Sequence, residues 1–321
     1  MPNEFTSIAT QPGLATELTQ DLWDRAVRAA LRELPTTRQF VDVRPQDPMA
    51  RGNSVTIEKF EWFGGDVVAA TLTPLNEEQD VDSVKMPKPT PVTLTPQEHG
   101  FAVTRTHLLN NKTFAPVDPQ IALSVAQVQN EAVDALVQAA VKAGTTAVTP
   151  GGVAENTLTN ASKITSGLLR RAVTRLRTNK APARAGTFYV GQTHPHVILD
   201  LREESGAGSW RVPNEYGASQ DRIWKGEVGE YEGVRWVENA LTSVTATGAN
   251  SANVYNTYIF GRGGLAEAVY EEPHVVIGPE VDKLRRFRTV GWYGILDFKV
   301  FEPKAIQRIV SGTSLGDDIG S

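Results

Sequence analysis

The sequence predicts an α+β fold in which helices and strands follow one another in mixed order. Segments 119–143 and 164–178 repeat apolar residues at the spacing of a helix with one buried face. Residues 54–107 instead show the two-residue alternation of long β ribbons. Because strands and helices do not alternate regularly, we do not expect a parallel α/β sheet.

Composition indicates one elaborate globular domain or two ordinary ones, with 321 residues, 40% of them hydrophobic and 21% charged. The net charge of −5 is too small to steer the protein strongly toward or away from nucleic acid. The chain has no cysteine, which excludes disulfides and is compatible with a reducing compartment. We expect no membrane span, because the sequence shows no secretory signal and no apolar run of about 20 residues.

The first predicted helix follows a polar segment, residues 1–15, and ends at Pro35. Its apolar stripe is thin and its other side is strongly charged, so it suits an arm lying on a larger body. The stripe consists of Leu18, Leu22, Ala26, Val27, Ala30, Leu31 and Leu34.

The next stretch predicts a β ribbon, with strands at 54–62 and 66–72 joined by a turn at Gly64-Gly65. Residues 76–96 are then rich in proline and charge, and a two-residue alternation resumes toward Val103. A ribbon with so few apolar residues is marginal alone in water. It therefore needs another surface, from the same chain or from a neighbour.

Asp118-Pro119 opens the strongest helix signal, because Asp118 can cap free backbone N–H groups and proline fits the first turn. Gly144 ends this helix. Its expected buried stripe is Ile121, Val125, Val128, Ala132, Leu136 and Ala139. The second helix, 164–178, is expected to bury Leu168, Leu169, Ala172, Val173 and Leu176.

Shorter elements are predicted after residue 180. They are a strand at 187–190, a helix from Pro195 to about Glu204, and strands at 234–238, 254–260, 289–301 and 306–310.

Two short motifs are candidates for chemistry. His194-Pro195-His196 resembles a metal-ligand pair, but Pro195 also fits a helix start flanked by two histidines, and no second ligand cluster accompanies it. The segment 261–264, Gly-Arg-Gly-Gly, lacks the lysine and spacing of a phosphate-binding loop and indicates a turn. We therefore expect no enzyme activity, no cofactor and no metal, since no catalytic motif occurs elsewhere in the sequence.

Two clusters of basic residues each allow two interpretations of their role. The clusters are Arg170, Arg171, Arg175 and Arg177 on the second helix, and Lys283, Arg285, Arg286 and Arg288 before the strand that contains Trp292. Either cluster is a solvated face, or it forms ion pairs between subunits or contacts DNA phosphates, which requires charge but no base readout.

The most informative stretch is 187–239, where a strand and a His-Pro helix start precede a Gly-Glu-Val-Gly and Gly-Val-Arg-Trp-Val-Glu run. The residues of the run are Gly226, Glu227, Val228, Gly229, Gly233, Val234, Arg235, Trp236, Val237 and Glu238. This combination resembles the core of the major coat protein of tailed bacteriophages in the N-four-like coat family. The resemblance implies the Hong Kong ninety-seven type fold. It also implies a structural protein whose hexamers and pentamers form an icosahedral head shell around double-stranded DNA.

The resemblance also implies a division of the chain. The expected parts are an N-terminal arm (1–50), an extended β loop (51–108), a peripheral domain (109–183) with a spine helix (119–143), an axial domain (184–272), and return strands with a C-terminal tail (273–321). Residues 205–229 would surround the symmetry axis of a capsomer. The expected interface residues are Leu18, Leu22, Trp62, Phe63, Trp210, Tyr216 and Trp224.

The implied partners are further copies of the same chain, a portal, a scaffolding protein on a separate chain, a cement protein and non-specifically contacted DNA, with no membrane. The implied location is the virion, after assembly in the host bacterial cytoplasm. Three alternatives remain at this point: the shell of an encapsulin-like nanocompartment, a tail or decoration protein, and an α+β hydrolase or binding enzyme.

Overall fold

The computed structural model describes residues 37–45, 52–60, 72, 74–80, 83–112, 117–203 and 227–315. Helices and strands follow in mixed order, which confirms the predicted α+β class. The α-helices are α3 (His107–Lys112), α4 (Val117–Gly144), α5 (Ser166–Thr178) and α6 (Pro195–Glu203). The short 3-10 turns are η1 (Thr37–Phe40), η2 (Pro150–Gly152), η3 (Glu155–Thr157), η4 (Ala249–Ser251) and η5 (Pro303–Ala305). The strands are β1 (Val55–Lys59), β2 (Thr90–Leu94), β3 (Gln97–Thr106), β4 (Ala147–Val148), β5 (Tyr189–Thr193), β6 (Glu227–Tyr231), β7 (Val234–Glu238), β8 (Val244–Thr245), β9 (Val254–Phe260), β10 (Leu265–Val281), β11 (Phe287–Val300) and β12 (Ile306–Ser311).

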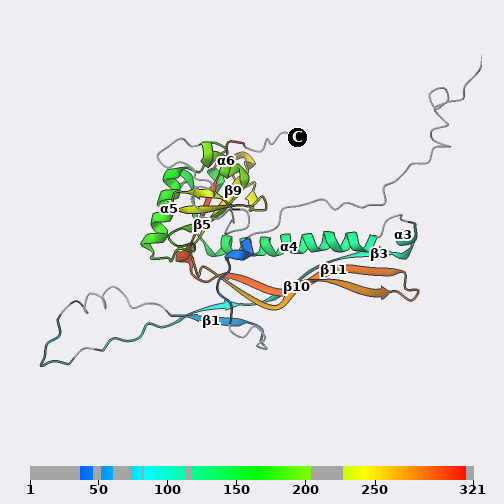
Figure 1. The fold of residues 1–321 in the computed structure, drawn as a ribbon, viewed down its shortest axis with the longest axis horizontal. Coiled ribbons are helices and arrows are strands. Elements are labelled where there is room, and N and C mark those ends of the chain that lie inside the picture. Colours follow the sequence, from blue (N-terminus) through cyan, green and yellow to red (C-terminus); the bar gives the residue numbers. More distant parts are fainter. Residues whose placement is uncertain are drawn as a thin grey trace, which may run out of the picture.

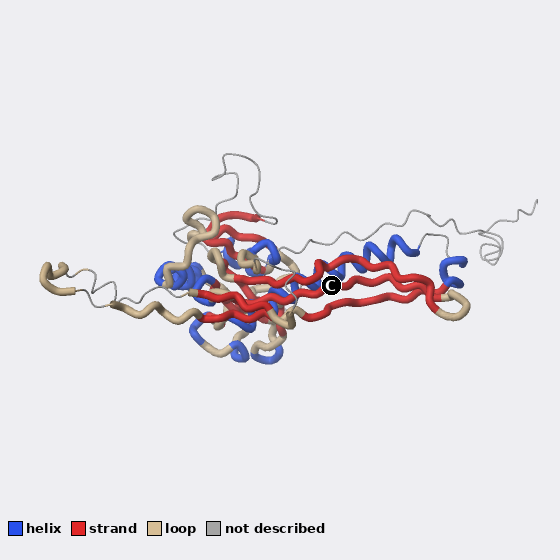
Figure 2. Tube along the Cα trace, turned by 90° about the horizontal axis from the view of Figure 1, so that it is seen from below, coloured by secondary structure: helices blue, strands red, loops and turns tan. Residues whose placement is uncertain are grey.

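A body and two extensions make up the described molecule (Figure 1). The body contains a seven-stranded sheet in the order β4-β12-β9-β5-β7-β6, with β8 paired to β9. One extension combines the long helix α4 with the three-stranded antiparallel sheet β10-β11-β3. The other extension is the antiparallel ribbon β1-β2, from which loop residues run farther outward (Figure 2).

Both faces of the body sheet are covered. Helices α5 and α6 pack on one face, where the five α5 residues predicted to be buried lie against Trp236 and Ile259. On the other face, Val190, Tyr258 and Phe260 join a cluster with residues of η1, α4 and β11. Strands β5, β9 and β12 are buried along their whole length because they lie between these two layers.

Helix α4 begins two residues before the predicted spine helix and ends at Gly144, one residue after it. At about 1.5 Å per residue, its 28 residues form a rod of roughly 42 Å. The predicted buried stripe was right in part: Val125 is buried and Ile121, Ala132 and Leu136 are half-buried, but Val128 and Ala139 are exposed. The first half of α4 covers only a narrow three-stranded sheet, whereas the second half enters the body and buries Val133, Val137 and Val141.

Strand β10 was not predicted from the sequence. It is 17 residues long and crosses residue 272, where the expected axial domain ends. It is an edge strand, since the order of its sheet is β10-β11-β3. Its pairing with β11 shifts register three times, and two of the shifts coincide with Pro273 and Pro279. Proline has no backbone N–H and is tolerated in sheets mainly at edges and bulges, which explains how this strand holds two of them.

The described part of the Gly-Glu-Val-Gly and Gly-Val-Arg-Trp-Val-Glu run is the hairpin β6-β7. Its two-residue turn, Glu232-Gly233, has φ of 52° and 76°, the left-handed values that a type I′ turn requires. The ring of Trp236 covers Gly191 of β5, where a Cβ atom would lie 2.6 Å from the ring. These residues therefore shape and pack the sheet.

The remaining predictions can be compared with the described residues. Strands β7 and β9 and the start of α6 lie where predicted, and β11 and β12 differ from prediction by one or two residues at their ends. Strand β5 begins two residues later and ends three residues later than the predicted strand at 187–190. The predicted N-terminal helix, the turn at Gly64-Gly65 and nearly all of the return strand 66–72 lie outside the described residues.

Candidate subunit interface

His194 and His196 flank the start of α6, which confirms the helix-start reading. His194 Nδ1 accepts a hydrogen bond from the backbone N–H of His196 at 3.3 Å, and His196 Nδ1 lies 3.0 Å from the Tyr255 hydroxyl oxygen. Burial, with a smaller contribution from His196, lowers the pKa of His194 to about 4. Among the described residues, no group of three or more His, Cys, Asp or Glu side chains is arranged to hold a metal ion.

The Gly-Arg-Gly-Gly segment forms the predicted turn, between β9 and β10. The backbone N–H of Gly263 donates to Asp42 Oδ2 at 2.7 Å, and Arg184 forms an ion pair with the same carboxylate. The turn therefore attaches the segment after η1 to the body. No helix in the described ranges is long and apolar enough to cross a membrane.

A buried carboxylate that the sequence reading missed lies where η1, α4 and the body meet. Asp134 is 1% exposed and accepts four hydrogen bonds, all from neutral donors. Two donors are the backbone N–H and hydroxyl of Thr37, at 2.7 and 2.8 Å. The others are Gln138 Nε2 at 2.9 Å and Asn239 Nδ2 at 3.2 Å. These contacts fix Thr37 of η1 to helix α4 and to the residue that follows β7.

The ribbon extension buries little. Its base packs Leu94, Val55 and Ile57 against Ala266 and Ala268 of β10. Farther out, every described residue from 72 to 86 is exposed, and Leu72 and Leu75 are 80% and 76% exposed. This segment therefore presents side chains without burying them in its own subunit.

The far end of the other extension is formed by α3 and by the turn between β10 and β11 (Figure 1). The two are joined by a hydrogen bond from the backbone N–H of His107 to the carbonyl of Arg286, at 2.8 Å. Leu108 and Leu284 are 63% and 73% exposed there. The basic residues predicted before β11 lie in and beside this turn, where Arg286 Nε is 2.6 Å from Asp282 Oδ2 and lowers the pKa of that carboxyl.

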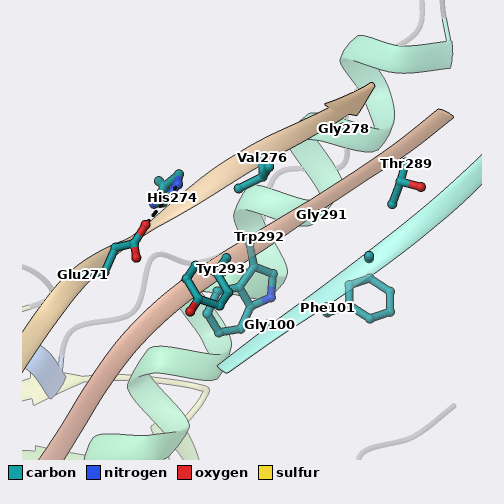
Figure 3. A pocket seen from close by; sticks show the side chains of 11 residues that line it. Gly100, Phe101, Glu271, His274, Val276, Gly278, Thr289, Gly291, Trp292 and Tyr293 are labelled. Carbon is teal, nitrogen blue, oxygen red and sulfur yellow. Dashed lines mark ion pairs between the residues drawn. The ribbon is translucent and has the colours of Figure 1, made fainter. Parts of the chain in front are cut away.

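A shallow groove of about 590 Å³ crosses the three-stranded sheet (Figure 3). Gly100, Gly278 and Gly291 contribute backbone to it, and larger side chains such as Val276 and Tyr293 stand beside them. Strand pairing places Gly291 opposite Ala102 and Val276, and places Trp292 and Phe101 on the alternate face, which α4 covers. The groove therefore lies on the side of the sheet away from α4.

The predicted arginines of α5 are all exposed. Arg170 pairs with Glu232 of the β6-β7 turn at 2.7 Å, and Arg175 lines a polar recess together with Arg308 and Glu155. An exposed ion pair of this kind contributes only about 0–1 kcal/mol. The cluster thus remains an exposed basic surface. The predicted interface residues Leu18, Leu22, Trp62, Phe63, Trp210, Tyr216 and Trp224 lie outside the described residues.

In the described residues, the side chains that could act as ligands or catalysts instead form turns, helix starts and packing contacts. The long extensions expose apolar and charged groups. This arrangement is that of a subunit that builds a larger structure. Solved structures that match this fold include phage capsids. The capsid of Ralstonia phage GP4 matches with a TM-score of 0.74 and 14% identity, covering 95% of this chain and 97% of that one. The capsid asymmetric unit of cyanophage Pam1 matches with a TM-score of 0.67 and 14% identity, covering 98% and 100%. The capsid of the native GTA particle matches with a TM-score of 0.62 and 12% identity, covering 97% and 100%.

A family model described as phage capsid protein matches residues 88–309. This match spans more than half of the chain, and the chain belongs to the phage capsid protein family. It is therefore a major capsid protein of a phage head shell, and the nanocompartment alternative is not favoured. A search of curated proteins by sequence found no match.

Proposed function

We propose that copies of this subunit assemble into hexamers and pentamers, which close an icosahedral head around double-stranded DNA. The observation that carries this proposal is the exposed ribbon extension. Ordering each of its residues costs about 1–2 kcal/mol in backbone entropy. The described residues from 72 to 86 are all exposed and bury little side-chain surface in return. A neighbouring subunit supplies the missing buried surface.

The proposed division of the chain follows the same logic. Residues 1–50 act as an arm, 51–108 as an extended loop, and 109–183 as a peripheral domain around the spine helix. Within 51–108, the ribbon is the part proposed to lie over a neighbour, because β3 pairs with β11 of its own subunit. Residues 184–272 form an axial domain, and 273–321 return to the peripheral domain and end in the tail. The shape of the subunit supports this division. Helix α4 and the β10-β11-β3 sheet project from the body, so that separate parts of one subunit reach separate neighbours.

The proposed role is structural and not enzymatic. Individual contacts can be weak, because each subunit makes many at once and their effects multiply in a closed shell. Such contacts are proposed for the interface residues that lie outside the described ranges. They are Leu18 and Leu22 in the arm, Trp62 and Phe63 in the loop, and Trp210, Tyr216 and Trp224 near the axis.

The arginines of α5 are proposed to meet DNA phosphates or acidic groups of a neighbour, contacts that depend on charge alone. The further partners proposed are a portal, a separate scaffolding protein and a cement protein, with assembly in the bacterial cytoplasm before the protein resides in the virion.

Electron microscopy of the purified full-length protein tests the proposal directly. We expect closed shells, with DNA when the particles come from infected cells. Tubes, protein-filled spheres or unassembled monomers under all conditions would contradict it.

Amide exchange tests the role of the extended loop separately. Residues 66–88 should exchange quickly in free subunits and slowly in shells, because the protecting surface belongs to a neighbour. Replacing residues 67–88, which leaves β2 and the buried Leu94 in place, with a short Gly/Ser turn should spare subunit folding and abolish shells. Equal protection in both states would instead make the ribbon part of the subunit's own core.

A further inference from the structure

The far end of the long sheet presents a surface that is both apolar and basic. We name it the basic tip: helix α3 together with residues 282–288. Its leucines, Leu108 and Leu284, are 63% and 73% exposed. Lys283 and Arg285 are also exposed, and neither side chain has an ion-pair partner among the described residues.

The outer loop of the ribbon presents the opposite charge. We name Leu72 and residues 74–80 the acidic loop. It carries the exposed carboxylates Glu77, Glu78 and Asp80 in the sequence Asn-Glu-Glu-Gln-Asp. Leu72 and Leu75 precede them and are 80% and 76% exposed. Both surfaces thus combine exposed leucines with charge, and the charges are of opposite sign.

These two surfaces cannot meet within one subunit. The acidic loop lies at one end of the molecule and the basic tip at the other, in both views (Figures 1 and 2). The roughly 42 Å length of α4 far exceeds the screening length of about 8 Å at physiological ionic strength, so their charges do not influence each other in a free subunit.

We propose that the acidic loop of one subunit docks on the basic tip of a second copy. The proposal rests on assembly of the subunit into a shell and names the surface that receives its extended loop. A second copy is the indicated occupant because the same chain carries a match in charge and in apolar character. Opposite charges guide the approach and set the register, and the leucines remove apolar surface from water.

The strength of one such contact is modest. An exposed ion pair contributes little, so two or three pairs are expected to change the contact affinity by about tenfold. A shell repeats the contact in every subunit, so a modest change becomes a large change in the assembled fraction. High salt, which shortens the screening length to about 3 Å at 1 M, should weaken the contact.

Charge reversal tests the proposal in the full-length protein. Glu77→Lys with Glu78→Lys, or Lys283→Glu with Arg285→Glu, should each lower the contact affinity by about tenfold and reduce shell yield. Combining all four reversals should restore assembly, because the signs are again complementary. The control reverses Lys180 and Lys304, which are also exposed, and should assemble like the original protein. Normal assembly of both paired reversals, or no recovery in the combined variant, would overturn the proposal.

Cross-linking provides a second test that does not depend on yield. Because the chain has no cysteine, single introduced thiols are unambiguous. With dissolved oxygen as the oxidant, co-assembled Glu78→Cys and Lys283→Cys subunits should form a disulfide-linked dimer that contains one copy of each, whereas Glu78→Cys with Lys180→Cys should not. Shells that form without the expected cross-link would reject the docking while leaving the shell function intact. Failure of the original protein to form shells would reject the proposed function instead.

Discussion

Removing the buried carboxylate of Asp134 should strongly destabilise the subunit. In Asp134→Ala, the backbone N–H of Thr37 and the amide of Asn239 lose their acceptor, while Gln138 Nε2 keeps the carbonyl of Leu241 at 3.1 Å. Each buried donor left without a partner costs about 1–3 kcal/mol. We therefore expect a loss of about 3 kcal/mol in the free energy of unfolding.

An opposing effect makes the outcome informative. The alanine variant no longer has to desolvate a buried charge, and such relief can offset lost contacts. Four hydrogen bonds of 2.7–3.2 Å favour the destabilising effect here. The measurement is urea unfolding of unassembled subunits, monitored by tryptophan fluorescence. The slope of the unfolding free energy against urea concentration should be the same in the variant and the original protein, because only stability changes.

Asn130→Ala is the matched control, because Asn130 is an exposed residue on the same helix and its change should stay within about 0.5 kcal/mol. Thr37→Val combined with Asp134→Ala should cost less than the sum of the two single changes, since both remove the same contact. A loss below about 1 kcal/mol in Asp134→Ala, or strict additivity in the pair, would refute the reasoning.

Four further outcomes are expected. Deletion of residues 1–36 should leave a folded, soluble subunit that assembles poorly; loss of helix signal beyond the deleted segment, by circular dichroism, would make the arm part of the core. Trp224→Ala should weaken capsomers by about 2 kcal/mol, which unchanged capsomer populations in native mass spectrometry would contradict. Gly191→Ala should cost about 1–3 kcal/mol in thermal unfolding, because its Cβ would lie 2.6 Å from the ring of Trp236. Burial lowers the pKa of His194 from 6.5 to about 4, so the unfolded chain binds the proton first and stability should fall as pH drops through this window; an equal pH slope in His194→Asn would argue against this origin.

Helix α5 and the body strands β7, β9 and β12 could be predicted because their patterns are local and match their surroundings. The five apolar residues of α5 face one sheet, so helical spacing alone identifies its buried side. Strand β9 is a short apolar run between turns, and its observed ends are the predicted ones. The shell function followed from the hairpin run, whose glycine and tryptophan are required by a turn and by close packing.

Strand β10 and Asp134 could not be predicted in the same way. Pro273, Pro279 and the neighbouring glutamates interrupt the alternation of β10, and only its place at the edge of a sheet makes them tolerable. The burial of Asp134 could not be predicted because a polar residue on a helix normally faces water. Its burial depends on partners 97 and 105 positions away in the sequence, and no local pattern contains them.

The irregular edge of β10 has a consequence for subunits crowded together during assembly. A long regular edge strand offers a row of backbone donors and acceptors that another edge can extend into a continuous sheet, which leads to aggregation. In β10, residues 273 and 279 have no N–H to offer, and three register shifts bend the strand between its ends. The wrong addition of a strand from another subunit is thereby suppressed. We expect incorrect association of subunits to be reversible and to give soluble species instead of fibres.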